Sequence, residues 1–205
     1  MNDHNSPPSG SSRRELLMAS ATAAAGAGAA VLVASCGGSG SNTKSTETVS
    51  TIQAQSDAAI LDALLDMERS SIVAYTLLAP KLRGAALAAA RTFLGHERRH
   101  AAALEAGIRA LGGSPSPLRP QSEYAATFPR IRGERDALSF ALDVENTAVA
   151  AYADALGKFV TDSVRVTTAA ILVTESEHAA VVLGDLGRPQ VPQPFVTGPP
   201  PQGGS

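Results

Sequence analysis

Glutamate and histidine recur in this sequence at spacings that suit metal binding. The pattern Glu-x-x-His occurs twice, at residues 97–100 and 175–178, and two further glutamates, Glu68 and Glu145, stand within apolar runs. In an α-helix, a glutamate and a histidine three residues apart lie on one face, so both can reach the same ion. Carboxylate and imidazole ligands without cysteine suit iron or manganese, and zinc is also compatible with them.

All four glutamates fall on the apolar face of an expected helix. The residues three, four and seven positions away from each of them are mainly leucine, isoleucine, valine, alanine or an aromatic residue. A buried carboxylate without a partner costs several kcal/mol or takes up a proton, so four in one core require cations. Two divalent ions would balance the four charges. The predicted ligands are Glu68, Glu97, His100, Glu145, Glu175 and His178.

A surface ion pair is the alternative for any single Glu-x-x-His pattern. The occurrence of all six residues on apolar faces favours a metal centre over that alternative. Tyr75 and Tyr152 lie two turns after Glu68 and Glu145. They could bond to a ligand or take part in one-electron chemistry, but we interpret them as core aromatic residues.

Three other polar residues lie off the predicted ligand faces. We expect Asp66 and Asp143 to be solvated, with a contact to a ligand histidine left open. His96 is also expected to be exposed.

The chain contains the same two-helix unit twice. Asp-x-Glu at residues 66–68 and 143–145 is followed in both halves by Ala-Tyr and then by Glu-x-x-His. The offset between equivalent residues is 77 for the first glutamate and 78 for the Glu-x-x-His pair. This repetition predicts a centre with approximate two-fold symmetry.

The apolar periodicity predicts four helices, at residues 56–78, 84–111, 132–160 and 162–186. The connection between the second and third helices is long and contains four prolines, whereas the other two connections are short. This is the loop pattern of a four-helix bundle with one crossover connection. We therefore expect an all-α domain over residues 56–186.

The residues before the domain are typical of an export leader. Arg13 and Arg14 precede a stretch rich in alanine and glycine that is too short and too weakly apolar for a membrane span. Cys36 follows Val-Ala-Ser, which resembles a bacterial lipoprotein cleavage site. We predict a twin-arginine signal over residues 1–36 with lipidation of Cys36, a flexible linker over 37–55, and a tail rich in proline and glycine over 187–205.

Composition excludes several classes of function. The net charge is −2 and no basic stripe is present, which argues against a nucleic-acid partner. Cys36 is the only cysteine, so the chain has no internal disulfide, no zinc-thiolate site and no rubredoxin-like electron-transfer domain. Any reductant must therefore come from another molecule.

These motifs resemble those of the ferritin-like superfamily of di-iron carboxylate proteins, and in particular its exported bacterial members with a twin-arginine lipoprotein leader. The resemblance covers residues 56–186, and Glu97-Arg98-Arg99-His100 is similar to the Glu-x-Arg-His variant of oxygen-activating members. It implies bridging roles for the glutamates of the two Glu-x-x-His patterns and terminal roles for their histidines. It also implies two iron ions, with manganese as the alternative. The chain departs from the family in lacking a fifth helix for a storage cage and an arginine before His178.

The resemblance implies ferroxidase or peroxidase-type activity with O2 or hydrogen peroxide as the substrate. Two alternatives remain open, namely a non-catalytic metal-binding or stress-related protein and a manganese catalase-like enzyme. The leader implies lipid anchoring on the extracytoplasmic side of the membrane, in the cell envelope. This location is compatible with a homodimer.

Overall fold

The computed structural model describes residues 42–195, 197 and 198, and it describes side chains from Ser50 onward. The predicted signal segment with Cys36 lies outside the described residues. The described residues contain no strand. Their helices are α1 (Asn42–Leu78), the 3-10 helix η2 (Ala79–Lys81), α2 (Gly84–Ala110), α3 (Gln121–Ala125), α4 (Glu134–Leu156) and α5 (Asp162–Asp185).

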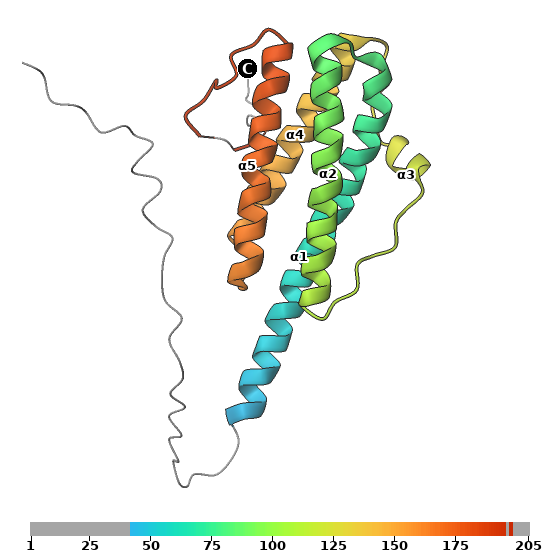
Figure 1. Ribbon diagram of the computed structural model, residues 1–205. Coiled ribbons are helices and arrows are strands. Elements are labelled where there is room, and N and C mark those ends of the chain that lie inside the picture. The colour runs from blue at the N-terminus through green and yellow to red at the C-terminus, as the bar shows by residue number, and fades with distance from the viewer. Residues whose placement is uncertain (1–41, 196, 199–205) are drawn as a thin grey trace, which may run out of the picture. The chain divides into compact units, whose positions relative to one another are not determined.

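The four long helices form a bundle of two antiparallel hairpins, α1–α2 and α4–α5 (Figure 1). Helix α1 also packs against α4, and α2 packs against α5. Because α2 ends at one end of the bundle and α4 begins at the other, the connection between them runs the length of the bundle (Figure 1). The predicted all-α bundle with a long crossover is therefore confirmed.

Helices α2 and α5 end in the same way, on a glycine in the left-handed region. Gly112 has φ +79° and Gly187 has φ +71°. In each case the following residue donates its N–H to a carbonyl of the last turn, from Gly113 to Ile108 and from Arg188 to Leu183, both at 2.9 Å. Both ends are Schellman motifs, in which a glycine with positive φ ends the helix. The two glycines therefore mark these helix ends in the sequence.

The first helix of each hairpin carries an acidic residue that binds the other hairpin. The buried Asp57 carboxylate of α1 accepts the N–H groups of Val160, at 3.1 Å, and Thr161, at 2.8 Å, just before α5. Glu134, the first residue of α4, accepts the N–H of Arg83 at 2.9 Å, just before α2. Glu134 follows Asp57 by 77 residues and Val160 follows Arg83 by 77 residues, so the two bonds are equivalent under the sequence repeat.

Two boundaries differ from the expected ones. Helix α1 begins at Asn42, so the predicted flexible linker is helical from that residue onward. The chain has no glycine or proline between Gly40 and Pro80 that would stop the helix earlier. Helix α4 ends at Leu156 rather than at residue 160, because Asp57 binds the N–H groups at the end of the loop that follows.

The crossover contains the short helix α3, which the sequence analysis did not predict. Pro120 immediately precedes it, and its carbonyl accepts the N–H of Glu123 in the first turn at 3.0 Å. Its Tyr124 is buried and donates its hydroxyl to Asp66 at 2.7 Å, and Arg119 donates its Nε to the same carboxylate at 3.1 Å. Asp66 therefore fastens the crossover to α1, while its side chain remains 43% exposed, so it is partly solvated as expected.

The core consists of two apolar clusters at different heights of the bundle. One contains Leu61, Leu104, Tyr152 and Phe159, and the other contains Tyr75, Phe93, Leu138 and Leu183, each with further aliphatic neighbours. Every long helix contributes to both clusters, with a short polar stretch between its two contributions. The fold therefore builds a polar layer between two apolar ones.

Helix α5 is the one described helix with the length and hydropathy of a membrane span. Its buried polar residues include Glu175 and His178, and it packs against α4 and α2. These contacts are those of a core helix of the bundle.

Candidate metal centre

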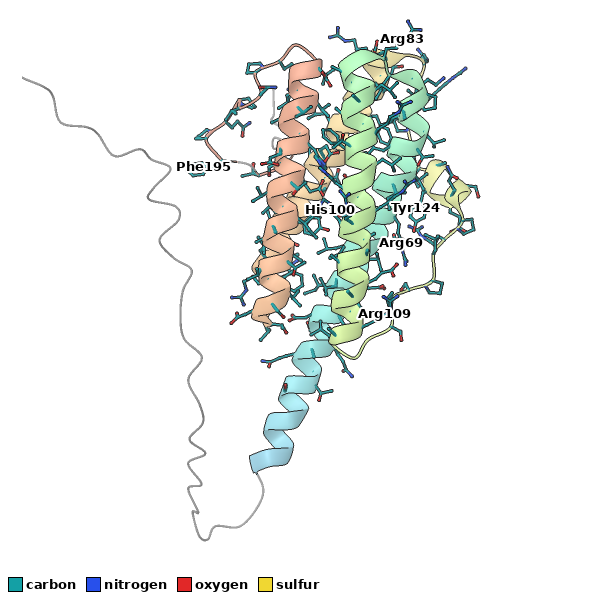
Figure 2. All side chains as sticks on the ribbon, in the orientation of Figure 1. Arg69, Arg83, His100, Arg109, Tyr124 and Phe195 are labelled. Atoms are coloured by element: carbon teal, nitrogen blue, oxygen red, sulfur yellow. The ribbon has the colours of Figure 1, made fainter. Side chains whose placement is uncertain are left out.

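The polar layer is made by the six residues that the sequence analysis singled out. The four glutamates are at most 1% exposed, while His178 is 2% and His100 is 9% exposed. Each long helix supplies one glutamate, and α2 and α5 also supply one histidine each. In Figure 2, His100 lies inside the bundle near its mid-height.

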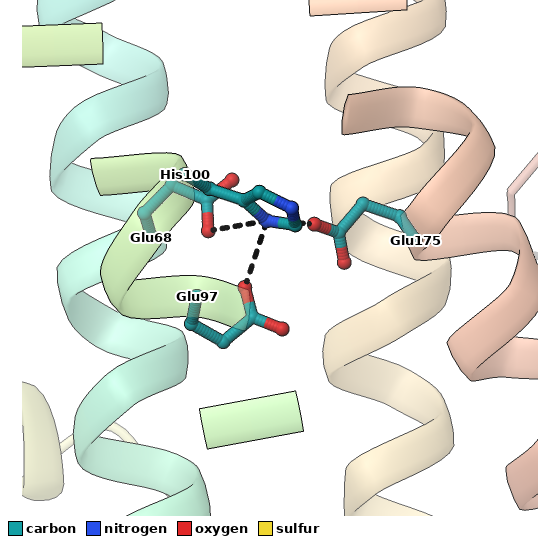
Figure 3. Close-up of side chains that lie close together, drawn as sticks. All are labelled: Glu68, Glu97, His100 and Glu175. Atoms are coloured by element: carbon teal, nitrogen blue, oxygen red, sulfur yellow. Dashed lines mark ion pairs between the residues drawn. The ribbon is translucent and has the colours of Figure 1, made fainter. Parts of the chain in front are cut away.

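His100 faces three of the carboxylates (Figure 3). Its Nδ1 lies 2.8 Å from Glu175 Oε1, 3.6 Å from Glu97 Oε2 and 3.7 Å from Glu68 Oε2. These residues come from three different helices. Their ligand atoms all lie within 4.8 Å of one another, close enough to surround one ion.

His178 faces a second set of carboxylates. Its Nδ1 lies 3.3 Å from Glu97 Oε1, 3.3 Å from Glu145 Oε2 and 3.6 Å from Glu175 Oε2. These ligand atoms also lie within 4.8 Å of one another.

The two sets overlap in Glu97 and Glu175. Each of these carboxylates turns one oxygen toward His100 and the other toward His178. Glu68 belongs only to the His100 set, and Glu145 only to the His178 set. Glu97 and Glu175 could therefore serve two ions at once, with Glu68 and His100 completing one position and Glu145 and His178 the other.

Several oxygen and nitrogen atoms of these six side chains are free to bind cations. Within the described part of the chain, four buried side-chain atoms make no hydrogen bond of good geometry, although two of them, His100 Nδ1 and Glu175 Oε1, lie 2.8 Å apart. The other two are Glu68 Oε2 and Glu97 Oε1. Unpaired buried polar atoms are rare in proteins and costly. All four belong to the six residues, and all four are atoms that metal ions bind, so the residues present fit a metal pair.

Without ions, the charges in this layer are balanced by protons. Burial raises the pKa of Glu68 well above its usual range and that of Glu145 to about 8. Burial alone would lower the pKa of the histidines, but the carboxylates close to each ring raise it to about 12 for His100 and about 11 for His178. Burial also favours the neutral form of Glu97, yet the two histidines beside it lower its pKa to about 2.

The two tyrosines bind the glutamates crosswise. The Tyr75 hydroxyl of α1 donates to Glu145 of α4, and the Tyr152 hydroxyl of α4 donates to Glu68 of α1. Both side chains are buried, and burial raises both tyrosine pKa values, so they remain donors at neutral pH. The interpretation of these residues as core aromatics alone was incomplete, since each also fixes one carboxylate.

His96 was wrongly expected to be exposed. It is half-buried, and its Nδ1 lies 2.9 Å from Nε2 of His178, on the side of that ring away from the carboxylates. Burial lowers the pKa of His96, and the neighbouring His178, His100 and Arg99 lower it further. A signal existed in the sequence, because all three histidines after residue 36 lie on α2 or α5 within one turn of a predicted ligand glutamate.

The aspartates near the first-helix glutamates do not contact the histidines. Asp66 binds the crossover as described above, and Asp143 is exposed on α4. Arg69, next to Glu68, donates to the Ser116 carbonyl of the crossover at 2.8 Å and to Glu105 of α2 at 3.1 Å. The layer around the centre is thus completed by the tyrosines and His96.

The chain is similar to known proteins both in sequence and in fold. A family model described as "Ferritin-like domain" matches residues 53–187. No curated protein matches the chain. Among solved structures, the chain is similar to a ferritin-like, diiron-carboxylate protein from Bacillus anthracis str. Ames, with a TM-score of 0.56 and 18% sequence identity. That alignment covers 65% of this chain and 97% of the other, and at this identity it establishes the fold.

Proposed function

Because the chain belongs to the ferritin-like domain family, we propose that its buried cluster binds two iron ions and reacts with O2 or hydrogen peroxide, as a ferroxidase or peroxidase. The main support for this proposal is that Glu97 and Glu175 each direct one carboxylate oxygen toward His100 and the other toward His178. The similar Bacillus anthracis protein is described as a diiron-carboxylate protein, which supports iron. When bound, iron supplies electron transfer to an oxygen-containing substrate.

The residues of the chain hold, orient and shield the centre. Glu68 and Glu145 are fixed by the hydroxyls of Tyr152 and Tyr75, so each keeps its free oxygen directed at one histidine. The apolar clusters on both sides keep bulk water away from the carboxylates and strengthen their attraction for cations. Electrons to restore the ferrous state must come from another molecule, since the chain has no cysteine besides Cys36 for an electron-transfer metal site.

The test is stopped-flow absorbance after mixing Fe(II)-loaded protein with peroxide or O2. The wild type is expected to oxidise its iron at least about tenfold faster than Glu97→Gln, which removes the charge of one carboxylate between the histidines. Glu177→Gln is the matched control because Glu177 is exposed on the same helix as Glu175, and it should react like the wild type.

The other outcomes decide between the alternatives. If the wild type reacted no faster than Glu97→Gln while metal removal sharply lowered its melting temperature, the ions would serve structure only. Rapid O2 release from peroxide by the manganese-loaded form would instead identify a catalase-like enzyme.

We further propose that the protein is exported and anchored to the membrane by a lipid on Cys36. Support comes from the paired Arg13 and Arg14 and from the residues around Cys36. Cys36→Ala is expected to move the protein from the membrane fraction to the soluble extracytoplasmic fraction of its native host. Retention of the variant in the membrane fraction would contradict lipid anchoring.

A further inference from the structure

The centre repeats almost every feature of one half in the other, but His96 has no counterpart. The repeat offset of 78 pairs His96 of α2 with Thr174 of α5. The Thr174 hydroxyl donates to the Ala170 carbonyl of its own helix at 3.3 Å. Within the described residues, no hydrogen bond reaches the outer nitrogen of His100 as His96 reaches that of His178.

His96 lies beside the ring nitrogen of His178 that faces away from the carboxylates, and this determines its effect on the ring proton of His178. Nδ1 of His178 faces the carboxylates, so a metal ion at that position needs its lone pair, and the ring proton must then reside on Nε2. In that tautomer Nε2 would donate to Nδ1 of His96, which lies 2.9 Å away. The neutral His96 is suited to accept this bond.

Stacking holds the His178 ring in the same orientation. Phe93 lies against it with a centroid distance of 3.9 Å and an interplanar angle of 24°. The His96 ring is nearly parallel to it, at 5.2 Å and 15°. His100, in contrast, is the more exposed of the two ligand histidines.

We propose that His96 is a positioning residue that fixes the tautomer and orientation of His178 and thereby makes the two metal positions unequal. The position at His178 binds its ion more tightly and fills first, and the position at His100 fills second. A hydrogen bond to the outer nitrogen of a ligand histidine raises the basicity of that ligand, and removing such partners lowers metal affinity by about 10–100-fold. This inference rests on the proposed two-metal function.

The experiment is a titration of the metal-free protein with Co2+, followed by visible absorption and by isothermal titration calorimetry. The wild type should bind two ions in two resolved steps. His96→Leu removes the acceptor, and His96→Phe removes it while keeping a stacked ring. Both are expected to weaken the tighter step by about 10–100-fold and to change its absorption band. His96→Asn, which presents an acceptor oxygen near the place of Nδ1, should restore wild-type binding to within a few-fold.

Two controls connect the effect to His178. Thr174→Val alters the equivalent residue in the other half and should leave both steps unchanged. In a double-mutant cycle, His96→Leu should have no further effect in a His178→Ala background but should keep its full effect in a His100→Ala background.

The inference is overturned if the wild type binds its two ions with equal affinity, if the Leu and Phe variants bind like the wild type, or if the Asn variant is as weak as they are. It is also overturned if His96→Leu still weakens binding when His178 is absent. Binding of fewer than two ions by the wild type would instead refute the proposed two-metal centre, and this result appears before any variant is made.

Discussion

At the level of single side chains, the protonation of the six buried residues determines how the centre takes up metal ions. In the metal-free layer, the raised pKa values of both histidines, Glu68 and Glu145 favour their protonated forms at neutral pH, whereas the lowered pKa of Glu97 favours its ionised form. Metal ions bind only the deprotonated forms of these ligands. Uptake of two divalent ions is therefore an exchange of ions for protons.

We predict that this exchange releases about four protons per protein at pH 7, two from the histidines and two from Glu68 and Glu145. The measurement is isothermal titration calorimetry with Co2+ in several buffers that differ in ionisation enthalpy. A release of only about two protons would show that Glu68 and Glu145 are already ionised in the metal-free protein.

A second prediction concerns the crossed tyrosines. Tyr75→Phe and Tyr152→Phe each leave a buried carboxylate oxygen without its donor, so each should destabilise the protein by about 1–3 kcal/mol and weaken metal binding about tenfold. Urea unfolding and Co2+ titration measure the two effects.

Tyr124→Phe is the matched control for these variants. It removes a bond to Asp66 away from the centre, so it should lower stability without changing metal affinity. Equal metal affinities in all three variants would contradict a role for Tyr75 and Tyr152 at the centre.

The sequence alone was sufficient to find the six clustered residues, because a glutamate on an apolar face conflicts with burial unless a cation is present. It could not reveal the partners of Tyr75 and Tyr152, since these depend on which helix lies beside which. His96 was missed for a related reason. It lies off the ligand face of its own helix, and its contact exists only because α5 packs against α2.

At the level of elements, the hydrogen bonds that Asp57 accepts from the N–H groups of Val160 and Thr161 join the two hairpins. Asp57→Ala leaves two N–H groups before α5 without an acceptor, and we predict a loss of about 2 kcal/mol in the free energy of unfolding. Glu134→Ala removes the equivalent but exposed bond and should cost about 0.5 kcal/mol. Urea denaturation of both variants measures the difference, and similar losses would contradict the importance of burial.

Helix boundaries were predictable where a local signal exists and not where tertiary contacts decide. The ends of α2 and α5 follow from Gly112 and Gly187, whose left-handed backbone suits glycine. The end of α4 depends on Asp57, which is about a hundred residues away in the sequence. The helix α3 also depends on a distant contact, the bond from Tyr124 to Asp66.

At the level of the whole molecule, stability should depend on pH in opposite ways with and without metal. Between pH 4.5 and about 8 the folded metal-free protein holds a proton on Glu145 that the unfolded chain has released, so its stability falls as pH rises. Above pH 6.5 the proton on His178, whose folded pKa is about 11, extends this fall. Below pH 4.5 the unfolded chain takes up protons that Glu97 does not bind, so stability falls toward acid.

We therefore predict that the melting temperature of the metal-free protein is highest near about pH 5 and declines toward pH 9. The Co2+-loaded protein should instead gain stability from pH 5 to pH 8, because metal binding is favoured as protons become scarce. Thermal unfolding followed by circular dichroism, with chelator and with Co2+, gives both curves. A metal-free protein that melted higher at pH 8 than at pH 5 would contradict this assignment of protons.

The crossed bonds between the hairpins also bear on how such a molecule could arise. Tyr75, Tyr152, Asp57 and Glu134 all bind the opposite hairpin, so each hairpin completes its partner as the subunits of a symmetric dimer do. Two identical hairpins would have to carry the same residue at equivalent places. A histidine at 96 opposite a threonine at 174 is available only to hairpins encoded separately within one chain. Fusion thus gives this fold a freedom that a homodimer of hairpins lacks, which is to specialise one half of a shared site without altering the other.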